Sequence, residues 1–371
     1  MSLRDVRRHV GQLLIGSCRG LSVPLELRAL AREFDLGGVT LFARNIESPE
    51  QVADLAHDLR HLGGEWPSWV AIDQEGGRVA RLRAPFTEWP PMAALGRADS
   101  EALADRFARA LARELRAVGV SLDFAPVLDV HTNAANPVIG DRALSDRADR
   151  VGALGAVIVR ALQEEGVVAC GKHFPGHGDT RADSHVDLPL VEHPPERLRS
   201  VEFVPFRAAI EAGVGAIMTA HVLVPAFDDA RPATLSPRIV SGILRQELGF
   251  DGAIVSDDLE MRAIADHQTA AAAAVAAIGA GCDIVLLCGG DLDRQAGVLE
   301  AIIRAIERDE LPLERVGEAM ARQRRLKEAA LAPGPLSALS PGWRPPSATA
   351  LRAVIGCGEH RAVAEEMAQY V

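Results

Sequence analysis

Eight short apolar runs, separated by amphipathic stretches, predict an α/β fold: a single (β/α)8 barrel of the TIM type. Each run is apolar at nearly every position and ends in polar or glycine-rich residues, which is typical of parallel strands buried on both faces. The length of 371 residues accommodates such a barrel, which takes about 250 residues or more. The predicted strands span residues 11–16, 37–42, 69–73, 120–127, 167–173, 214–221, 252–258 and 282–288.

The stretches between these runs carry apolar residues at helical spacing, so we expect helices to cover the barrel. The most regular stretches span residues 49–62, 100–118, 147–165, 196–212, 236–248 and 261–280. A doubly wound open sheet is the alternative architecture, but neither GxGxxG nor GxxxxGKS/T follows any of the apolar runs. The barrel is therefore favoured.

The end of the chain departs from this pattern. Residues 311–330 are expected to form a closing helix, whereas residues 331–347 contain five prolines and two glycines. A last helix is expected at residues 359–370. We therefore predict one catalytic domain, residues 1–330, followed by a proline-rich linker and a helical tail, residues 331–371, with no second domain.

Composition excludes several classes of function. The 40 basic and 51 acidic residues give a net charge of −11, which argues against nucleic-acid partners. The five cysteines are scattered without CxxC spacing, as in a reducing compartment. The apolar run near the N-terminus is too short for a signal peptide, and the alanine-rich run 269–280 is shorter than the roughly 20 residues that cross a bilayer. We expect a soluble cytoplasmic protein, a monomer or weak homodimer, without membrane contact.

Polar residues stand at the ends of successive predicted strands, where barrel enzymes carry their active sites. These residues are Asp73 with Glu75, Asp129, Lys172 with His173, His221, and Asp257 with Asp258. Alone, each has an ordinary explanation: Asp73 could cap a helix, and Arg142 of the segment IGDRAL could pair with Asp141 or Asp146. Their convergence at one end of a barrel predicts a ligand site instead.

Asp73 and the pair Asp257–Asp258 are the candidate carboxylates. An aspartate at a strand end can accept two hydroxyl hydrogen bonds, as in sugar recognition, and Gly76 with Gly77 allows a tight turn beside Asp73. Neighbouring residues of a strand point to opposite sides, so we expect only one of Asp257 and Asp258 to face the barrel mouth. A carboxylate there is suited to act as a nucleophile or base, and helix capping by both is the alternative.

The densest group of reactive residues is the segment 169–189, ACGKHFPGHGDTRADSHVDLP. Lys172 and His173 can donate hydrogen bonds to the oxygens of a ligand. Asp183 and His185, two residues apart, could form a carboxylate–imidazole pair for proton transfer, since histidine has a reference pKa of ~6.5. This segment therefore combines ligand binding with acid–base chemistry.

The same segment allows a metal site as the rival interpretation. His173, His177 and His185, with Asp179 or Asp183, are ligand types that zinc or manganese accepts. Metal-dependent hydrolases on barrels draw their ligands from several strands, however, and no HxH motif ends the first predicted strand. We therefore expect no metal and no cofactor. A histidine-rich loop without chemistry is the other alternative.

With these residues in order along the chain, the sequence resembles glycoside hydrolase family 3, and within it the bacterial β-N-acetylglucosaminidases of cell-wall recycling. The resemblance spans residues 11–330 and is carried by KHFPGHGDTRADSH, with DQEGGRV, IGDR and SDDLEM around it. It implies Asp257 as the nucleophile, His185 as the general acid/base and Asp183 as its partner. The residues that it implies for holding the terminal N-acetylglucosamine are Asp73, Arg81, Arg142, Lys172 and His173. Larger members add a C-terminal α/β sandwich domain, which we do not expect here.

The resemblance also implies a reaction. Retaining hydrolysis would remove non-reducing terminal N-acetylglucosamine from muropeptides or chitooligosaccharides, through a glycosyl ester on Asp257. Because a neutral imidazole does not repel an incoming anion, phosphorolysis stays open, and so does another family 3 β-glycosidase activity. A metal-dependent hydrolase and a non-catalytic sugar-binding barrel are the alternatives from other classes. A small carbohydrate is the expected partner.

Overall fold

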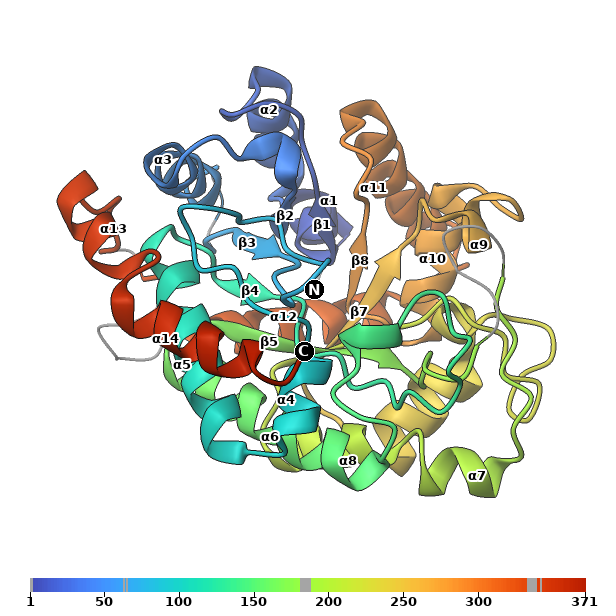
Figure 1. The fold of residues 1–371 in the computed structure, drawn as a ribbon. Helices are drawn as coiled ribbons and strands as arrows, with labels where there is room; N and C mark the ends of the chain where they lie inside the picture. Colours follow the sequence, from blue (N-terminus) through green and yellow to red (C-terminus); the bar gives the residue numbers. More distant parts are fainter. Residues whose placement is uncertain (1–2, 63, 65, 181–187, 332–338, 341) are drawn as a thin grey trace.

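The computed structural model describes residues 3–62, 64, 66–180, 188–331, 339–340 and 342–371. Its eight strands are parallel and close into a barrel in the order β1 to β8, which confirms the predicted (β/α)8 architecture (Figure 1). Each strand overlaps one of the eight apolar runs of the sequence. The strands are β1 (Leu14–Gly16), β2 (Gly38–Leu41), β3 (Trp69–Ile72), β4 (Leu122–Asp123), β5 (Val168–Phe174), β6 (Ala216–Thr219), β7 (Ala253–Asp258) and β8 (Ile284–Leu286).

Helices surround the barrel and connect consecutive strands (Figure 1). The longer ones are α2 (Leu25–Phe34), α3 (Pro49–Arg60), α5 (Glu101–Ala117), α6 (Ala148–Glu164), α8 (Val204–Glu211), the π-helix η5 (Arg238–Glu247), α10 (Ala270–Ala280) and α11 (Leu292–Glu307). The shorter ones are α1 (Leu3–His9), η1 (Val10–Leu13), η2 (Ala43–Asn45), α4 (Ala93–Ala98), η3 (Gly140–Arg142), α7 (Pro195–Ser200), η4 (Ala233–Leu235) and α9 (Arg262–Ala265).

Two stretches predicted as single helices each form two. Residues 196–212 divide into α7 and α8, and α8 begins anew with Pro205 in its first turn, where a proline needs no amide donor. Residues 261–280 divide into α9 and α10, because the Thr269 side chain accepts a hydrogen bond from the Ala272 amide and caps a new helix. In both cases local capping chemistry interrupts a continuous apolar periodicity.

Apolar side chains fill two layers. One set packs between the strands and the surrounding helices, and a second, smaller set fills the interior of the barrel. The interior set includes Trp69 and Ala71 on β3, Val168 and Cys170 on β5, and Ala253 and Val255 on β7. The barrel is therefore a packed core rather than a pore, and active sites of this fold lie at its C-terminal end.

Helix α12 (Leu313–Leu331) closes the opposite, N-terminal end of the barrel. Lys327 is fully buried there, and its ammonium donates to the Gln12 side chain at 2.7 Å and to the Gly37 carbonyl at 3.0 Å. Gln323 accepts a hydrogen bond from the Trp69 indole at 2.9 Å. These polar contacts tie the closing helix to the barrel floor.

The C-terminal helices α13 (Ala348–Val354) and α14 (Gly358–Ala368) lie against the helical layer beside α5 (Figure 1). Helix α14 confirms the helix expected at residues 359–370. The division of the chain into a domain and a tail at residue 330 stays a prediction. Within the described residues, we find no helix long and apolar enough to cross a membrane.

Candidate functional site

Alternation along three odd-numbered strands explains how polar side chains reach the barrel mouth. The inward-facing residues of β3, β5 and β7 are apolar and two positions apart. Two positions further along the same strands stand Asp73, Lys172 and Asp257. Because inward and outward side chains alternate, the three polar groups face the interior at its C-terminal end. The alternation of side chains thus brings one polar group from each of the three strands to the same end of the barrel.

The even-numbered strands provide the floor below these groups. Phe124, Met218 and Leu286 face inward at the ends of β4, β6 and β8. Together the two sets form a cavity of about 310 Å³. It is lined by Phe42, Asp73, Glu75, Val79, Arg81, Phe124, Val138, Arg142, Lys172, His173, His177, Met218, Asp257, Asp258, Met261, Leu286 and Cys288. The floor is apolar and the walls are charged.

Ion pairs join the groups that follow β3 and β5. Lys172 donates to Asp73 Oδ1 at 2.7 Å and lies 2.6 Å from Glu75 Oε1. The Arg142 guanidinium donates two hydrogen bonds to the Glu75 carboxylate, from Nη2 to Oε1 at 2.8 Å and from Nε to Oε2 at 2.9 Å. The Arg81 guanidinium lies 3.3 Å from Asp73 Oδ2. Four of the five sequence-predicted sugar-binding residues belong to this one network, and His173 does not. Lys172 is its centre, because it joins Asp73 to Glu75.

Burial alone would raise the pKa of Glu75, but the adjacent Lys172 and Arg142 outweigh it, so the pKa lies well below its usual range. Burial opposes the charge of Lys172 as well, yet Asp73 and Glu75 raise its pKa above the ordinary value. Glu75 and Lys172 are therefore charged across the physiological pH range. One interpretation of the sequence pairs Arg142 with Asp141 or Asp146. In the structure its bidentate partner is Glu75, 67 positions away.

The buried carboxylate of Asp129 fixes the imidazole ring of His173. Its Nδ1 lies 2.7 Å from Asp129 Oδ2, and the amide of His177 donates to Asp129 Oδ1 at 2.6 Å. Burial raises the pKa of Asp129 while His173 lowers it, and the net shift is downward. Since the ionised Asp129 accepts the Nδ1 proton, the Nε2 atom of His173 is the ring nitrogen left for a ligand. Asp129 was recognised in the sequence only as a strand-end polar residue.

Asp257 and Asp258 both line the cavity, but Oδ1 of Asp258 accepts hydrogen bonds from the amides of Glu260 and Cys288. The expectation that only one of the two side chains faces the barrel mouth stays a prediction. The pairing of β7 with β8 shifts register between Val255 and Asp258, which breaks the strict alternation at this end of the strand. His221 supports the turn, because its Nε2 lies 2.9 Å from the Asp258 carbonyl oxygen. His221 itself lies outside the set of cavity-lining residues.

The two neighbouring aspartates differ in protonation. Burial raises the pKa of Asp257, but His221, His173 and the Asp258 amide, which donates at 2.8 Å, give a net shift downward. Burial, with Glu260 and Asp257 nearby, raises the pKa of Asp258 to about 7. Asp257 is therefore the carboxylate that is ionised at neutral pH and able to act as a nucleophile.

Two of the predicted catalytic residues, Asp183 and His185, lie outside the described residues. The same holds for part of the metal alternative, which combines His173, His177 and His185 with Asp179 or Asp183. Within the described part of the chain, no group of three or more His, Cys, Asp or Glu side chains has the arrangement of a metal site. There, His173 is held by Asp129, and His177 Nδ1 lies 2.6 Å from the Thr180 hydroxyl.

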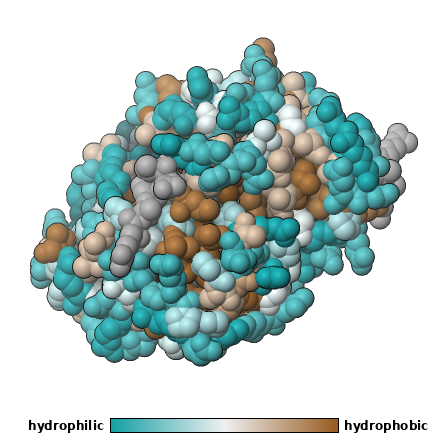
Figure 2. Space-filling view, turned by 90° about the vertical axis from the view of Figure 1, so that its right-hand side faces the viewer, coloured by the Kyte–Doolittle hydropathy of each residue, from teal (hydrophilic) through white to brown (hydrophobic). Residues whose placement is uncertain are grey.

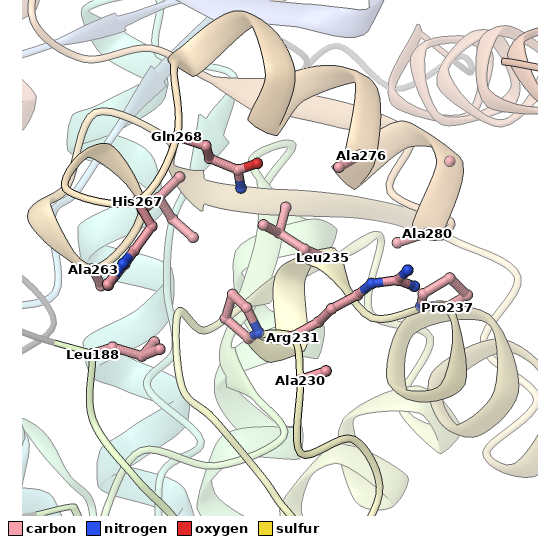
Figure 3. A pocket seen from close by; sticks show the side chains of 13 residues that line it. Leu188, Ala230, Arg231, Leu235, Pro237, Ala263, His267, Gln268, Ala276 and Ala280 are labelled. Atoms are coloured by element: carbon pink, nitrogen blue, oxygen red, sulfur yellow. The ribbon is translucent and has the colours of Figure 1, made fainter. Parts of the chain in front are cut away.

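A second cavity, of about 540 Å³, lies on the outside of the barrel. It opens on the face that carries α9 and α10, where apolar residues gather in a hollow (Figure 2). Leu235 and Arg231 line one side of it, and His267 and Gln268 line the other (Figure 3). Although it is larger than the cavity in the barrel mouth, the described residues that line it include no carboxylate. The barrel mouth, where the described residues include Asp73, Glu75 and Asp257, is therefore the candidate active site.

A (β/α)8 barrel with an ionised aspartate among charged hydrogen-bonding groups, over an apolar floor, has the site of a carbohydrate-active hydrolase. The comparison with known families gives the particular class. The family model described as the glycosyl hydrolase family 3 N-terminal domain matches residues 5–326, and the chain belongs to this family.

Relatives and solved structures agree with this membership. Beta-hexosaminidase A of Pseudoalteromonas piscicida is 36% identical over 339 residues, which cover 84% of this chain and 57% of that protein. The chain thus spans little more than half the length of that relative. A family 3 β-N-acetylglucosaminidase from Paenibacillus sp. is 40% identical with a TM-score of 0.90, covering 98% of this chain and 68% of the other. NagZ from Neisseria gonorrhoeae, solved with N-trifluoroacetyl-D-glucosamine, is 29% identical with a TM-score of 0.77, covering 98% of both chains.

Proposed function

We propose that this chain is a retaining β-N-acetylglucosaminidase that removes a terminal N-acetylglucosamine residue from cell-wall fragments. The observation that carries the proposal is the ionised Asp257, which faces a cavity shared with Asp73, Arg142 and Lys172. The relatives named as β-hexosaminidases and β-N-acetylglucosaminidases support the choice of sugar. Muropeptides are the proposed natural substrates.

The cavity suits a single sugar unit. Its volume of about 310 Å³ is at the lower end of the range for small-molecule pockets, about 300–1,000 Å³. Asp73 can accept hydrogen bonds from two hydroxyls, while Lys172, Arg81 and Arg142 can donate to the ring substituents. Phe124, Met218 and Leu286 offer an apolar surface to the face of the ring. A site of this size, for one sugar unit, fits an exo-acting enzyme.

The proposed first step forms a covalent glycosyl ester. A carboxylate oxygen of Asp257 attacks the anomeric carbon as the bond to the leaving oxygen breaks, and His185 gives its proton to that oxygen. In the second step His185 takes a proton from water, which attacks the same carbon and frees Asp257. The role of His185, with Asp183 as its partner, rests on the resemblance of the motif KHFPGHGDTRADSH to family 3 enzymes.

Two observations support Asp257 rather than Asp258 as the nucleophile. With a pKa raised to about 7, it is half protonated near neutrality. Its Oδ1 also accepts hydrogen bonds from the amides of Glu260, at 3.1 Å, and Cys288, at 3.2 Å. Asp258 is therefore engaged in holding the turn after β7.

Release of nitrophenol from the aryl β-N-acetylglucosaminide tests the proposal directly. We expect turnover by the unchanged protein in the presence of chelator, and none by Asp257→Ala. A fluorinated, slowly hydrolysed substrate should label Asp257, and the labelled peptide is identified by mass spectrometry. Label on Asp258 would overturn the assignment of the nucleophile, and loss of turnover in chelator would favour a metal-dependent hydrolase. Appearance of the sugar 1-phosphate when phosphate is added would indicate phosphorolysis instead of hydrolysis.

A cytoplasmic location is proposed with this function. All five cysteines are free thiols in the structure, which fits a reducing compartment. Fractionation of cells of the source organism, followed by an assay of each fraction, would test it. Activity confined to a secreted fraction would contradict the proposal.

A further inference from the structure

The C-terminal helices pack beside the segment that follows β3. Helices α13 and α14 both contact α5, and Gly356 lies in the turn between them. Gly356 has a φ of +56°, and a Cβ there would lie 2.2 Å from the Pro85 carbonyl oxygen. Only glycine allows the turn to approach the backbone of Pro85 this closely. The tail is thus fitted against the loop that follows β3 as well as against α5.

Glu114 of α5 joins this tail to the same segment. Its carboxylate accepts hydrogen bonds from the amide and the hydroxyl of Thr87, at 3.0 and 2.6 Å, and from the Gly356 amide at 2.9 Å. His360 of α14 completes the set, with Nδ1 2.9 Å from Oε1. Glu114, Thr87 and His360 are 2%, 3% and 3% exposed, so water cannot replace a lost donor without a rearrangement.

Thr87 belongs to the same loop as the cavity-lining residues Asp73 and Arg81. Two positions further along the chain, the backbone carbonyl oxygen of Trp89 accepts a hydrogen bond from the Gly77 amide at 2.8 Å. The ring of Trp89 packs edge-on against Phe107 of α5. At the other side of the turn, the Gln74 side chain accepts from the Arg81 amide at 2.7 Å. The segment 73–92 is therefore a closed loop that is anchored on β3 at one end and on α5 with the tail at the other.

We propose that Glu114 and His360 are positioning residues of the sugar site, and that the C-terminal tail fixes the loop that carries Asp73 and Arg81. Neither Glu114 nor His360 lines the cavity, so each acts through Thr87 and the backbone of the loop. The sequence leaves the role of residues 331–371 open, and this inference assigns one to the part that contains α14. This inference rests on the proposed function, because KM and kcat can be measured only if the protein hydrolyses the glycoside.

A pair of substitutions at His360 separates positioning from folding. His360→Leu keeps the volume and removes the donor to Glu114, whereas His360→Asn keeps an amide nitrogen near the position of Nδ1. The matched control is Glu366→Gln, because Glu366 pairs with Arg106 at 2.7 Å and so also joins α14 to α5, but at the surface. The measurements are KM and kcat for the aryl glycoside, hydrogen exchange of residues 76–92, and the midpoint of thermal unfolding.

We expect His360→Leu to raise KM by about 3- to 10-fold and to leave kcat within about twofold, because the loop binds the sugar equally in the ground state and the transition state. Exchange of residues 76–92 should become faster in this variant. His360→Asn and Glu366→Gln should resemble the unchanged protein in both measurements.

A lower melting midpoint in His360→Leu, with KM and loop exchange unchanged, would overturn the inference, and so would an equal rise of KM in Glu366→Gln. If the unchanged protein fails to hydrolyse the glycoside, the proposed function fails. Hydrogen exchange then still tests the coupling of the tail to the loop, so the two failures are distinguishable.

Discussion

The two sides of the barrel mouth treat their charges in opposite ways. On the side of β3 and β5, Asp73, Glu75, Lys172 and Arg142 are cross-linked, and each carboxylate lies within 2.9 Å of a cation. On the side of β7, the described residues include no ion-pair partner for Asp257 or Asp258. The first side has its charges neutralised and its geometry fixed. Among the described residues, the hydrogen bond to Asp257 comes from the Asp258 amide to Oδ1, which leaves this ionised carboxylate available for a new bond.

This difference matches the work proposed for each side. A binding wall must hold several donors and acceptors at fixed positions, and buried ion pairs with good geometry do this even where they add little stability. A nucleophile must lose its charge as it attacks, so a tight cation would oppose the reaction. The contrast predicts that substitutions on the two sides differ in kind.

Asp257→Asn should have the largest effect. It keeps the shape of the side chain and removes the nucleophile, so we expect kcat to fall by about 10⁴-fold or more. Asp258→Asn is the matched control, and its kcat should remain within about tenfold of that of the unchanged protein. Steady-state kinetics on the aryl glycoside measures both. Equal losses in the two variants would contradict the division of roles.

Lys172→Met should break the binding wall. It leaves Asp73 and Glu75 without a shared cation, and we expect the free energy of unfolding to fall by about 3 kcal/mol, together with a rise in KM. The half-buried surface pair Arg28–Asp58 provides the control, since Arg28→Met should cost less than about 1 kcal/mol. Urea unfolding at pH 7 compares the two. A loss at Lys172 as small as that at Arg28 would show that the buried network is unimportant for stability.

Asp258 should make stability depend on pH. Its folded pKa of about 7 is above the unfolded value of ~3.9, so the folded state holds the proton longer. The contribution of this group to the free energy of unfolding therefore falls as pH rises from about 4 to 7, by at most about 1.4 kcal/mol per pH unit. Asp258→Asn should remove this slope in urea titrations at several pH values. Parallel curves for the two proteins would contradict the prediction.

Asp123→Asn should have the smallest effect. Burial raises the pKa of Asp123 well above its usual range, and its Oδ1 accepts a hydrogen bond from the Gln74 amide at 2.9 Å. A neutral carboxyl group resembles an amide in charge and size, so we expect kcat and KM to change by less than about twofold. A loss of tenfold or more would mean that Asp123 is ionised and belongs to the charged wall.

The sequence predicts the fold well because its signal is local. Each buried parallel strand is a short apolar run, and the eight runs need only be counted. The positions of Asp73, Lys172 and Asp257 follow from the same alternation. Helix breaks such as the one before α10 depend on a single cap, Thr269, which a continuous alanine-rich pattern conceals.

The partners within the site could not be predicted in the same way. Arg142 has acidic residues close to it in the sequence, and only the closed barrel brings Glu75 within reach. The contact of Glu114 with His360 spans 246 positions, and neither residue belongs to a recognised motif. The irregular pairing between Val255 and Asp258 is a property of β7 and β8 together. Long-range geometry decides all three.

The layering of the barrel interior also bears on how such enzymes can diversify. The odd-numbered strands supply Asp73, Lys172 and Asp257, while the even-numbered strands supply Phe124, Met218 and Leu286 directly beneath them. Reactive groups thus occupy the last inward position before each loop, one step beyond the residues that pack the core. Substitutions at this last inward position change the reactive groups and leave the core residues below it in place. The reactive side chains and the side chains that pack the core are therefore only two residues apart along each of these strands.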